Sequence, residues 1–305
     1  MAEDVSPIIA RRLVRLALRD ARDQAKMTQP QVAEAMEWSL SKVIRIENGD
    51  VSIAPNDLRP LLAFLNVKDR TTVNELLALA KIARTRQRNE WQLKPGIKDH
   101  LTPPMLRQIE YEAEAVEIRY YTVYYLPGPL QTPEYAWANL SYFDEDDIPM
   151  ETRRVRAEAR QRRREVVLSR LDHGLSIYSL LDESVLRRSL GGPAVFLEQL
   201  RELNNLATAG KIKIRMIPFK MQYTLTNNAT FDLITLKSGG AEDRSEVLYR
   251  ETGLGDEIVE DQSVLRHHLR FEKIWHAAAP EETTIEFIGE MMKEMEEEIH
   301  PTPGS

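Results

Sequence analysis

Residues 28–49, TQPQVAEAMEWSLSKVIRIENG, contain the start and stop signals of two short helices that lie only a few residues apart. Thr28 is a suitable N-cap, and a glutamine follows three residues later, as in a capping box. Ser39 provides a second N-cap, and Asn48-Gly49 is typical of a helix C-terminus. Two helices joined by so tight a turn can pack in only a few ways. The segment therefore predicts a helix-turn-helix layout.

The helical pattern continues on both sides of this segment. Residues 8–26 place apolar side chains at spacings of three and four, which predicts an amphipathic helix. Two further helices are expected to begin at Asp57 and at Thr72, with Pro60 in the first turn of the former. No strand signal separates them. Residues 1–90 are therefore expected to form an all-α domain of about five helices.

The remainder of the chain mixes helix and strand patterns. Residues 91–104 are rich in proline and are predicted to be a linker. Residues 105–280 are predicted to form a mixed α/β domain around a small sheet, and residues 281–305 a C-terminal helix and tail. Within them we expect helices over 105–120, 152–171, 183–190, 193–208, about 257–277 and 281–299, and strands over 175–181, 212–217, 231–236 and 246–250. The predicted fold class is α+β.

The charges are distributed unevenly along the chain. The whole sequence has 41 Lys and Arg against 48 Asp and Glu, a net charge of −7. Residues 1–99 contain 17 basic and 13 acidic side chains, a balance of +4, and residues 100–305 contain 24 and 35, a balance of −11. This asymmetry suggests two parts with different partners. We expect contact with an anionic polymer such as DNA to be concentrated in the first hundred residues.

The sequence contains no cysteine. This excludes disulfides, thiol nucleophiles, iron–sulfur clusters and cysteine-based zinc sites. No apolar run approaches the roughly 20 residues of a membrane span, and the first residues lack the basic start and apolar core of a signal peptide. We therefore expect a cytoplasmic protein that does not contact a membrane.

Polar side chains occupy the positions at which such a helix-turn-helix contacts DNA. A polar residue at the start of the first helix reaches phosphate, short residues at the start of the second reach base edges, and a basic residue one turn later reads guanine or phosphate. The candidates are Gln29, Ser39, Leu40, Ser41, Lys42 and Arg45. The alternative is a plain helical hairpin, because the same apolar stripe forms a core in either case. Five arginines outside the motif are further phosphate contacts or ordinary solvated charges: Arg11, Arg12, Arg84, Arg86 and Arg88.

The order T-Q-x-x-V-A followed by S-x-S-K-V-x-R-I-E-N-G resembles the XRE-type (lambda-repressor-like) helix-turn-helix, and the resemblance covers residues 10–80. It implies that phosphates are held by Gln29, Ser39 and Asn48, and that bases are faced by Leu40, Ser41, Ile44 and Arg45. Two features depart from the family pattern. The turn residue, often glycine, is Glu37, which slightly strains a left-handed turn. Ile44 offers no hydrogen bond, so any base contact there is apolar.

A second pattern lies further along the chain, with P-G-x-L-Q-T-P-E-Y-A at residues 127–136, then D-E-x-x-L-R-R and G-G. Over roughly residues 105–280 the chain resembles the C-terminal domain of unknown function that follows XRE-type DNA-binding domains in actinobacterial regulators, a class described as antitoxin-like. The resemblance implies a transcriptional regulator, often encoded near a small partner protein. It brings no established ligand or reaction.

Two groups of side chains in this domain are candidates for ligand or partner contact. Aromatic residues around the rigid Pro-Gly-Pro turn either line a pocket or groove or build the core. An arginine stripe either meets DNA or an acidic partner or is a solvated helix face paired with glutamates. The stripe consists of Arg153, Arg156, Arg160 and Arg163. The candidate contacts are Tyr124, Leu130, Tyr135, Trp137 and Arg160.

No catalytic motif is present, and we expect no enzymatic activity and no cofactor. His268, Glu272 and His276 share one helix face, but eight residues span about 12 Å, too far for both histidines to bind one metal ion. One histidine–glutamate pair with an unseen third ligand remains an alternative.

The expected function is that of a sequence-specific DNA-binding transcriptional regulator. One short recognition helix reads few bases, so we expect a homodimer on a palindromic operator, with the C-terminal domain dimerising and sensing an effector or a small protein. The C-terminal helix is one candidate interface, through Ile285, Ile288, Met292 and Met295. The alternative is an antitoxin-like protein that neutralises a small partner and binds DNA only for autoregulation.

Overall fold

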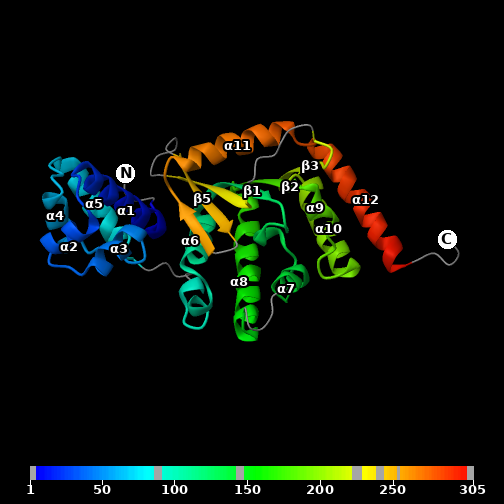
Figure 1. Ribbon diagram of the computed structural model, residues 1–305, viewed down its shortest axis with the longest axis horizontal. Coiled ribbons are helices and arrows are strands. Elements are labelled where there is room, and N and C mark those ends of the chain that lie inside the picture. The colour runs from blue at the N-terminus through cyan, green and yellow to red at the C-terminus, as the bar shows by residue number, and fades with distance from the viewer. Residues whose placement is uncertain are drawn as a thin grey trace. The chain divides into compact units, whose positions relative to one another are not determined.

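The computed structural model describes residues 5–85, 91–141, 148–221, 229–237, 244–252 and 255–300. The chain divides into two units (Figure 1). The first comprises residues 1–90 together with 236–245, and the second comprises residues 91–235 and 246–305. The predicted fold class is confirmed, since an N-terminal helical region is followed by a mixed α/β region with a six-stranded sheet.

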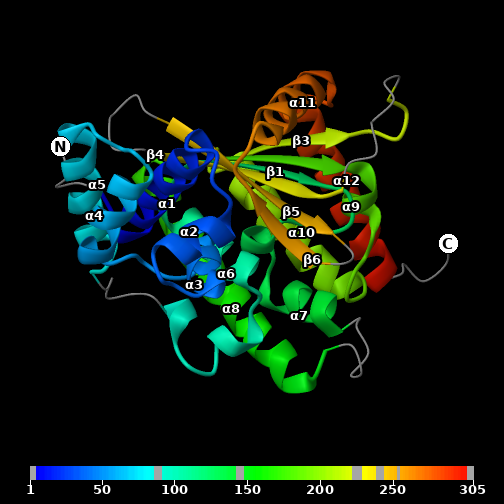
Figure 2. The same cartoon turned by 60° about the vertical axis from the view of Figure 1, so that its left-hand side comes forward.

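The first unit contains five helices in residues 5–85, as the sequence predicts. They are α1 Pro7–Gln24, α2 Gln29–Ala35, α3 Leu40–Asn48, α4 Pro55–Phe64 and α5 Arg70–Ile82. Figure 2 shows α2 and α3 lying side by side. Residues 5–85 contain no strand.

Local capping explains where these helices begin. The predicted capping box forms, because the Thr28 N–H donates to Gln31 Oε1 at 2.8 Å and Thr28 Oγ1 accepts from the Gln31 N–H at 3.4 Å. The last two helices start two residues earlier than predicted. α4 begins at Pro55, whose missing N–H needs no partner in a first turn. α5 is capped by Asp69, whose carboxylate accepts from the Thr72 N–H at 2.7 Å.

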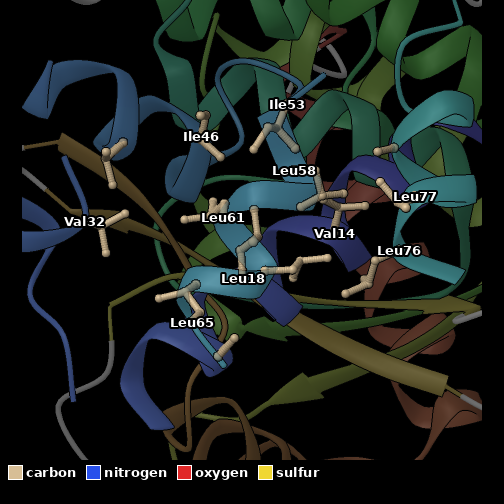
Figure 3. Close-up of a cluster of buried hydrophobic side chains, with 14 of the residues drawn as sticks. Val14, Leu18, Val32, Ile46, Ile53, Leu58, Leu61, Leu65, Leu76 and Leu77 are labelled. Atoms are coloured by element: carbon tan, nitrogen blue, oxygen red, sulfur yellow. The ribbon is translucent and has the colours of Figure 1, made fainter. Parts of the chain in front are cut away.

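The core of the helical unit forms between the apolar faces of all five helices. Val14 and Leu18 of α1 pack with Val32 of α2, Ile46 of α3 and leucines of α4 and α5 (Figure 3). These side chains are buried. Because α3 is held by one face only, its opposite face lies outside the core.

The second unit is organised around a mixed sheet with the strand order β3-β2-β1-β4-β5-β6. The strands are β1 Ala115–Thr122, β2 Ser176–Asp182, β3 Lys213–Ile217, β4 Phe231–Lys237, β5 Arg244–Thr252 and β6 Gly255–Val259. β1 and β2 are parallel, with Tyr120 opposite Ser179, and β2 and β3 are also parallel. β5 and β6 form an antiparallel pair.

Helices cover both faces of this sheet. On one face lies α11, which packs Phe271, Ile274 and Trp275 against strand residues such as Tyr121 and Phe231, while α6 and α8 lie on the other face (Figure 1). α12, a candidate dimer interface from its sequence, packs against α10 and β3, with Ile288 buried and Ile285, Met292 and Met295 half-buried. The α-helices of this unit are α6 Pro103–Glu114, α7 Pro133–Ser141, α8 Met150–Ser169, α9 Glu183–Arg187, α10 Pro193–Thr208, α11 Ser263–Ala277 and α12 Glu281–Ile299. The short 3-10 helices are η1 Trp91–Leu93, η2 Lys98–His100, η3 Gly128–Leu130 and η4 Leu171–His173.

At two places the sequence predicts helix and the structure has strand. The helix expected over residues 105–120 ends at Glu114, and β1 follows at once. β1 lies between two other strands, and Ile118, Tyr120 and Tyr121 are all buried. A strand covered on both faces lacks the alternation that marks a half-buried one. β6 occupies the start of the helix expected from about residue 257, because a short polar strand carries little pattern.

The arginine stripe of α8 is directed into the second unit. Arg163 donates to both carboxylate oxygens of Glu112, a buried side chain of α6, with one of these bonds at 2.6 Å. Arg156 Nε donates to the carbonyl of His100 at 3.0 Å. Arg153 is buried as well. The stripe therefore makes contacts within the unit and is not a fully solvated helix face.

Burial of Asp232 on β4 generates a pH prediction. Burial raises the pKa of its carboxyl well above the usual value of about 4, and Arg163 opposes this only in part. The folded protein then retains a proton that the unfolded chain has lost, so stability should fall as pH rises from about 4 through the raised pKa. Asp232→Asn should flatten the dependence of stability on pH and raise the melting temperature at pH 8 by about 2–4 °C.

Thermal unfolding followed by circular dichroism between pH 5 and pH 8 measures the effect. Asp99→Asn, at an exposed acid of the same unit, is the matched control. An Asp232→Asn profile as steep as that of the wild type would show that another group is responsible.

Candidate nucleic-acid interface

The turn between α2 and α3 is short and left-handed at one residue. Glu37 has φ 54°, so the non-glycine turn predicted from the sequence is present. The turn closes through the Trp38 N–H, which donates to the carbonyl of Ala33 at 2.8 Å. Ser39 Oγ then accepts from the Lys42 N–H at 3.2 Å and starts α3. At the other end Gly49, with φ 80°, terminates the helix in the left-handed conformation that favours glycine.

The two faces of α3 differ in accessibility. Val43, Ile46 and Glu47 are buried. The candidate contacts Gln29, Lys42 and Ile44 are half-buried, and the candidates Ser39, Leu40, Ser41, Arg45 and Asn48 are exposed. All eight predicted contact residues thus lie outside the core, on α2, the turn and the outer edge of α3.

A largely buried ion pair joins α1 to α3. Arg22 Nε donates to Glu47 Oε1 at 2.6 Å and Arg22 Nη2 to Oε2 at 3.0 Å, a bidentate geometry. The Glu47 carboxylate, chiefly through its hydrogen bond, raises the pKa of Arg22. Gln29 Nε2 also donates to Glu47 Oε2 at 2.8 Å. The Glu47 carboxylate, in the last turn of α3, therefore links α3 both to Arg22 of α1 and to Gln29, the first residue of α2.

Lys42 is engaged within the unit. Its Nζ lies 2.9 Å from Asp57 Oδ2 on α4 and 3.8 Å from the centre of the Trp38 ring. A base or phosphate must compete with both contacts. Arg45, in contrast, is exposed at the outer edge of the helix and has no ion pair among the described residues.

The arginines outside the motif are not equivalent. Arg12 is buried, Arg11 is half-buried and Arg84 is exposed. Arg86 and Arg88 lie outside the described residues. Among the five named from the sequence, Arg84 thus has the most accessible side chain in the part of the chain that the structure describes.

The candidate contacts of the second unit divide into core and surface. Leu130 and Tyr135 are buried, so the structure places them in the core and removes them from any surface for a partner. Tyr124 is 57% exposed and Trp137 is 38% exposed. Arg160 is half-buried, with Nη1 3.5 Å from the carbonyl of Ala136, and burial lowers the pKa of its guanidinium.

The loop around Pro127-Gly128-Pro129 explains this division. Gln131 Nε2 donates to the carbonyl of Leu126 at 2.7 Å, and the Leu126 N–H donates to the Tyr135 hydroxyl at 3.4 Å. Gln199 of α10 accepts from the Thr132 N–H at 2.7 Å and donates to the Leu130 carbonyl at 2.9 Å. The loop is tied down by these buried amides, so Leu130, Gln131 and Tyr135 serve packing and backbone hydrogen bonds.

The histidine positions noted in the sequence have protein partners. His268 Nδ1 lies 2.8 Å from Glu246 Oε1, and His276 Nε2 lies 3.5 Å from Glu272 Oε2. Glu272 also pairs with Arg119. The described residues contain no group of three or more such side chains that fits a metal ion. Within the same part of the chain, no helix has the length and apolar character to cross a membrane.

Comparison with family models matches both units. Residues 14–76 match the model described as a helix-turn-helix domain. Residues 106–290, more than half of the chain, match the model described as a domain of unknown function, DUF5753. The chain belongs to the DUF5753 family. No curated protein and no solved structure matched.

In this DUF5753 protein, the two matches correspond to different elements. The helix-turn-helix match includes all of α2, α3 and α4. The DUF5753 match begins within α6 and ends within α12, so it includes every strand of the sheet.

Three residues of the DUF5753 protein's helix-turn-helix were not predicted from its sequence. Arg22 and Glu47 fix α2 and α3 from their inner side, and Asp57, whose side chain is 42% exposed, holds Lys42 in an ion pair. One signal was present. Glu47 follows Val43 at a spacing of four and Ile46 directly, which places a carboxylate on the buried side of α3, and a buried carboxylate requires a cation or hydrogen-bond donors.

Replacement of Glu47 tests whether the ion pair braces α3. Glu47→Ala leaves Arg22 half-buried without its main partner, and we expect a destabilisation of about 3 kcal/mol. Faster hydrogen exchange at α2 and α3 amides should accompany it, because these helices lose a common anchor. Hydrogen exchange with mass spectrometry locates the effect. The exposed Glu34→Ala on α2 is the control, and equal protection in both variants would argue against a bracing role.

Proposed function

We propose that this DUF5753 protein is a sequence-specific DNA-binding transcriptional regulator of the XRE type. The observation that carries the proposal is the outer edge of α3, where Ser41 and Arg45 are exposed one helical turn apart. The other face of α3 is fixed by the core and by Glu47. A rigid helix with a polar outer edge fits the major groove of B-DNA, where base edges present hydrogen-bonding groups.

The side chains divide into two roles. Ser41 and Arg45 face bases, with Arg45 suited to the O6 and N7 acceptors of guanine, and Leu40 and Ile44 provide apolar contact to thymine methyl groups. Ser39 and Asn48 hold phosphates. Gln29 gives one amide N–H to Glu47 and retains the second for a phosphate oxygen.

Two copies are part of the proposal. α3 has nine residues, and such a helix reads only a few base pairs. A homodimer on a palindromic operator places two recognition helices about one turn of DNA apart, roughly 34 Å. Cooperation between the half-sites supplies the specificity that one helix lacks.

The second unit is proposed to receive the regulatory signal, as an effector or a small protein partner. The exposed Tyr124 and Trp137 support partner contact, because tyrosine and tryptophan are enriched in interfaces. We assign the protein to the cytoplasm, with the chromosome, and assign it no catalytic step and no cofactor. The antitoxin-like alternative rests on resemblance alone, and co-purification of a small protein that the second unit neutralises would favour it.

Replacing the two base-facing polar residues should abolish operator binding. Ser41→Ala with Arg45→Ala removes two contacts worth about 1–3 kcal/mol each, so affinity should fall on the order of 100-fold or more. Selection from a random duplex library with the wild-type protein supplies the operator, and footprinting or a gel shift at fixed salt measures the loss.

Circular dichroism of the same double variant should be unchanged, since both side chains are exposed. Glu34→Ala, an exposed residue of α2, is the control for a general surface effect. An intact footprint with the double variant would refute the assignment of α3 as the recognition helix.

Removal of the Lys42 partner should strengthen DNA binding. Asp57→Asn frees Lys42 from an ion pair that DNA must displace, so we expect affinity to rise several-fold, by about 1 kcal/mol or less. Glu34→Gln removes the same single charge without contacting Lys42 and serves as the control. Equal gains in the two variants would show that only net charge matters.

A further inference from the structure

The two sides of α11 have different character. Phe271, Ile274 and Trp275 pack on the sheet and are buried. On the outward side, Leu265 is 61% exposed and Leu269 is 60% exposed. The two leucines are four residues apart, so they form one apolar surface on adjacent turns.

This leucine pair differs from the other exposed apolar side chains. Among the described residues, the remaining large ones lie singly on different elements, and no second pair occurs at helical spacing. Single exposed apolar residues are ordinary, whereas adjacent ones create a patch that gains free energy when water is excluded. The outward side of α11 is therefore the best candidate for an apolar contact surface among the described residues.

We propose that this leucine patch packs against the same patch of a second copy of the chain, with the two α11 helices antiparallel. The proposal rests on the homodimer of the proposed function and identifies its contact surface. A two-fold axis at the level of residue 267 places Leu265 of each copy against Leu269 of the other. The patch is thereby self-complementary, as a symmetric dimer requires.

The charges at the two ends of the patch favour this direction, whereas the exposed Arg266 of each copy, one residue from the axis, is brought level with its counterpart and weakens the pairing. Asp261 precedes α11 and Lys273 lies near its end, and both are exposed. Each is six residues from the proposed axis, about 9 Å along the helix. Antiparallel pairing therefore sets Asp261 of one copy beside Lys273 of the other. Parallel pairing would set like charges together at both ends.

The size of the patch predicts a weak affinity. Four leucines bury well under the roughly 1,000 Å² of a standard interface, so the free protein should associate only weakly, with a Kd above the micromolar range. An operator with two half-sites raises the effective concentration of one copy near the other. The contact should therefore appear as cooperativity on DNA as well as self-association in solution.

The absence of cysteine makes the arrangement directly testable. Leu265→Cys and Leu269→Cys each introduce the sole thiol of the chain. When the two variants carry tags of different size and are mixed under mild oxidation, the mixed disulfide should be the main product on a non-reducing gel. Phe219→Cys, at a site 62% exposed on the same unit, is the matched control and should give only background cross-linking.

The cross-linking pattern separates the alternatives. A dominant Leu265–Leu265 cross-link in the Leu265→Cys variant alone would overturn the antiparallel direction. Cross-linking no stronger than that of the Phe219→Cys control in every mixture would overturn the interface. A wild-type protein that stays monomeric at high concentration and binds a different protein through this patch would also refute pairing with a second copy.

Sedimentation without DNA provides the second measurement. Leu265→Asp with Leu269→Asp should weaken self-association on the order of 100-fold or more, with an unchanged circular dichroism spectrum because both sites are exposed. Phe219→Asp should leave the dimer intact. Since this measurement needs no operator, a failure here leaves the DNA-binding proposal to be judged by the Ser41 and Arg45 variants.

Discussion

The carboxylate of Glu47 is the point at which the first three helices meet. It accepts from Arg22 of α1 and Gln29 of α2 while it belongs to α3 itself. A buried carboxylate without such partners carries a large desolvation penalty, so the three helices are held in one relative orientation. The direction in which Ser41 and Arg45 point is consequently set by a contact on the opposite side of α3.

The second unit uses the same physical device between a helix pair and a sheet. Glu112 of α6 pairs with Arg163 of α8, and the hydroxyl of Tyr120 on β1 donates to the same carboxylate at 3.2 Å. Buried ion pairs contribute little stability relative to well-packed apolar residues. We therefore attribute to this pair the positioning of α8 over the sheet. The arginines of α8, whose spacing in the sequence suggests a surface stripe, thus make their contacts within the unit.

Structural features that depend on neighbouring residues were predicted well from the sequence, whereas features that depend on contacts between distant residues were not. Thr28 and Ser39 mark their helices because a cap bonds within three residues of itself. β1 was missed because its burial comes from strands and helices distant in the chain. The partner of Glu47 lies 25 residues away, and no periodicity pairs two such side chains. The contact residues predicted from the motif lie outside the core, whereas the residues that hold α2 and α3 in place could be found only from the fold.

The tied loop at residues 126–132 bears on how relatives of this chain should be compared. In the most recognisable part of its motif, Leu130 is buried in the core and Gln131 donates a hydrogen bond to the carbonyl of Leu126. A relative with the same two residues should fold this loop in the same way. Its ligand has to be inferred from residues that the loop does not constrain, such as Tyr124. Agreement at the strongest motif of the domain is therefore weak grounds for transferring a biological role from one member of the family to another.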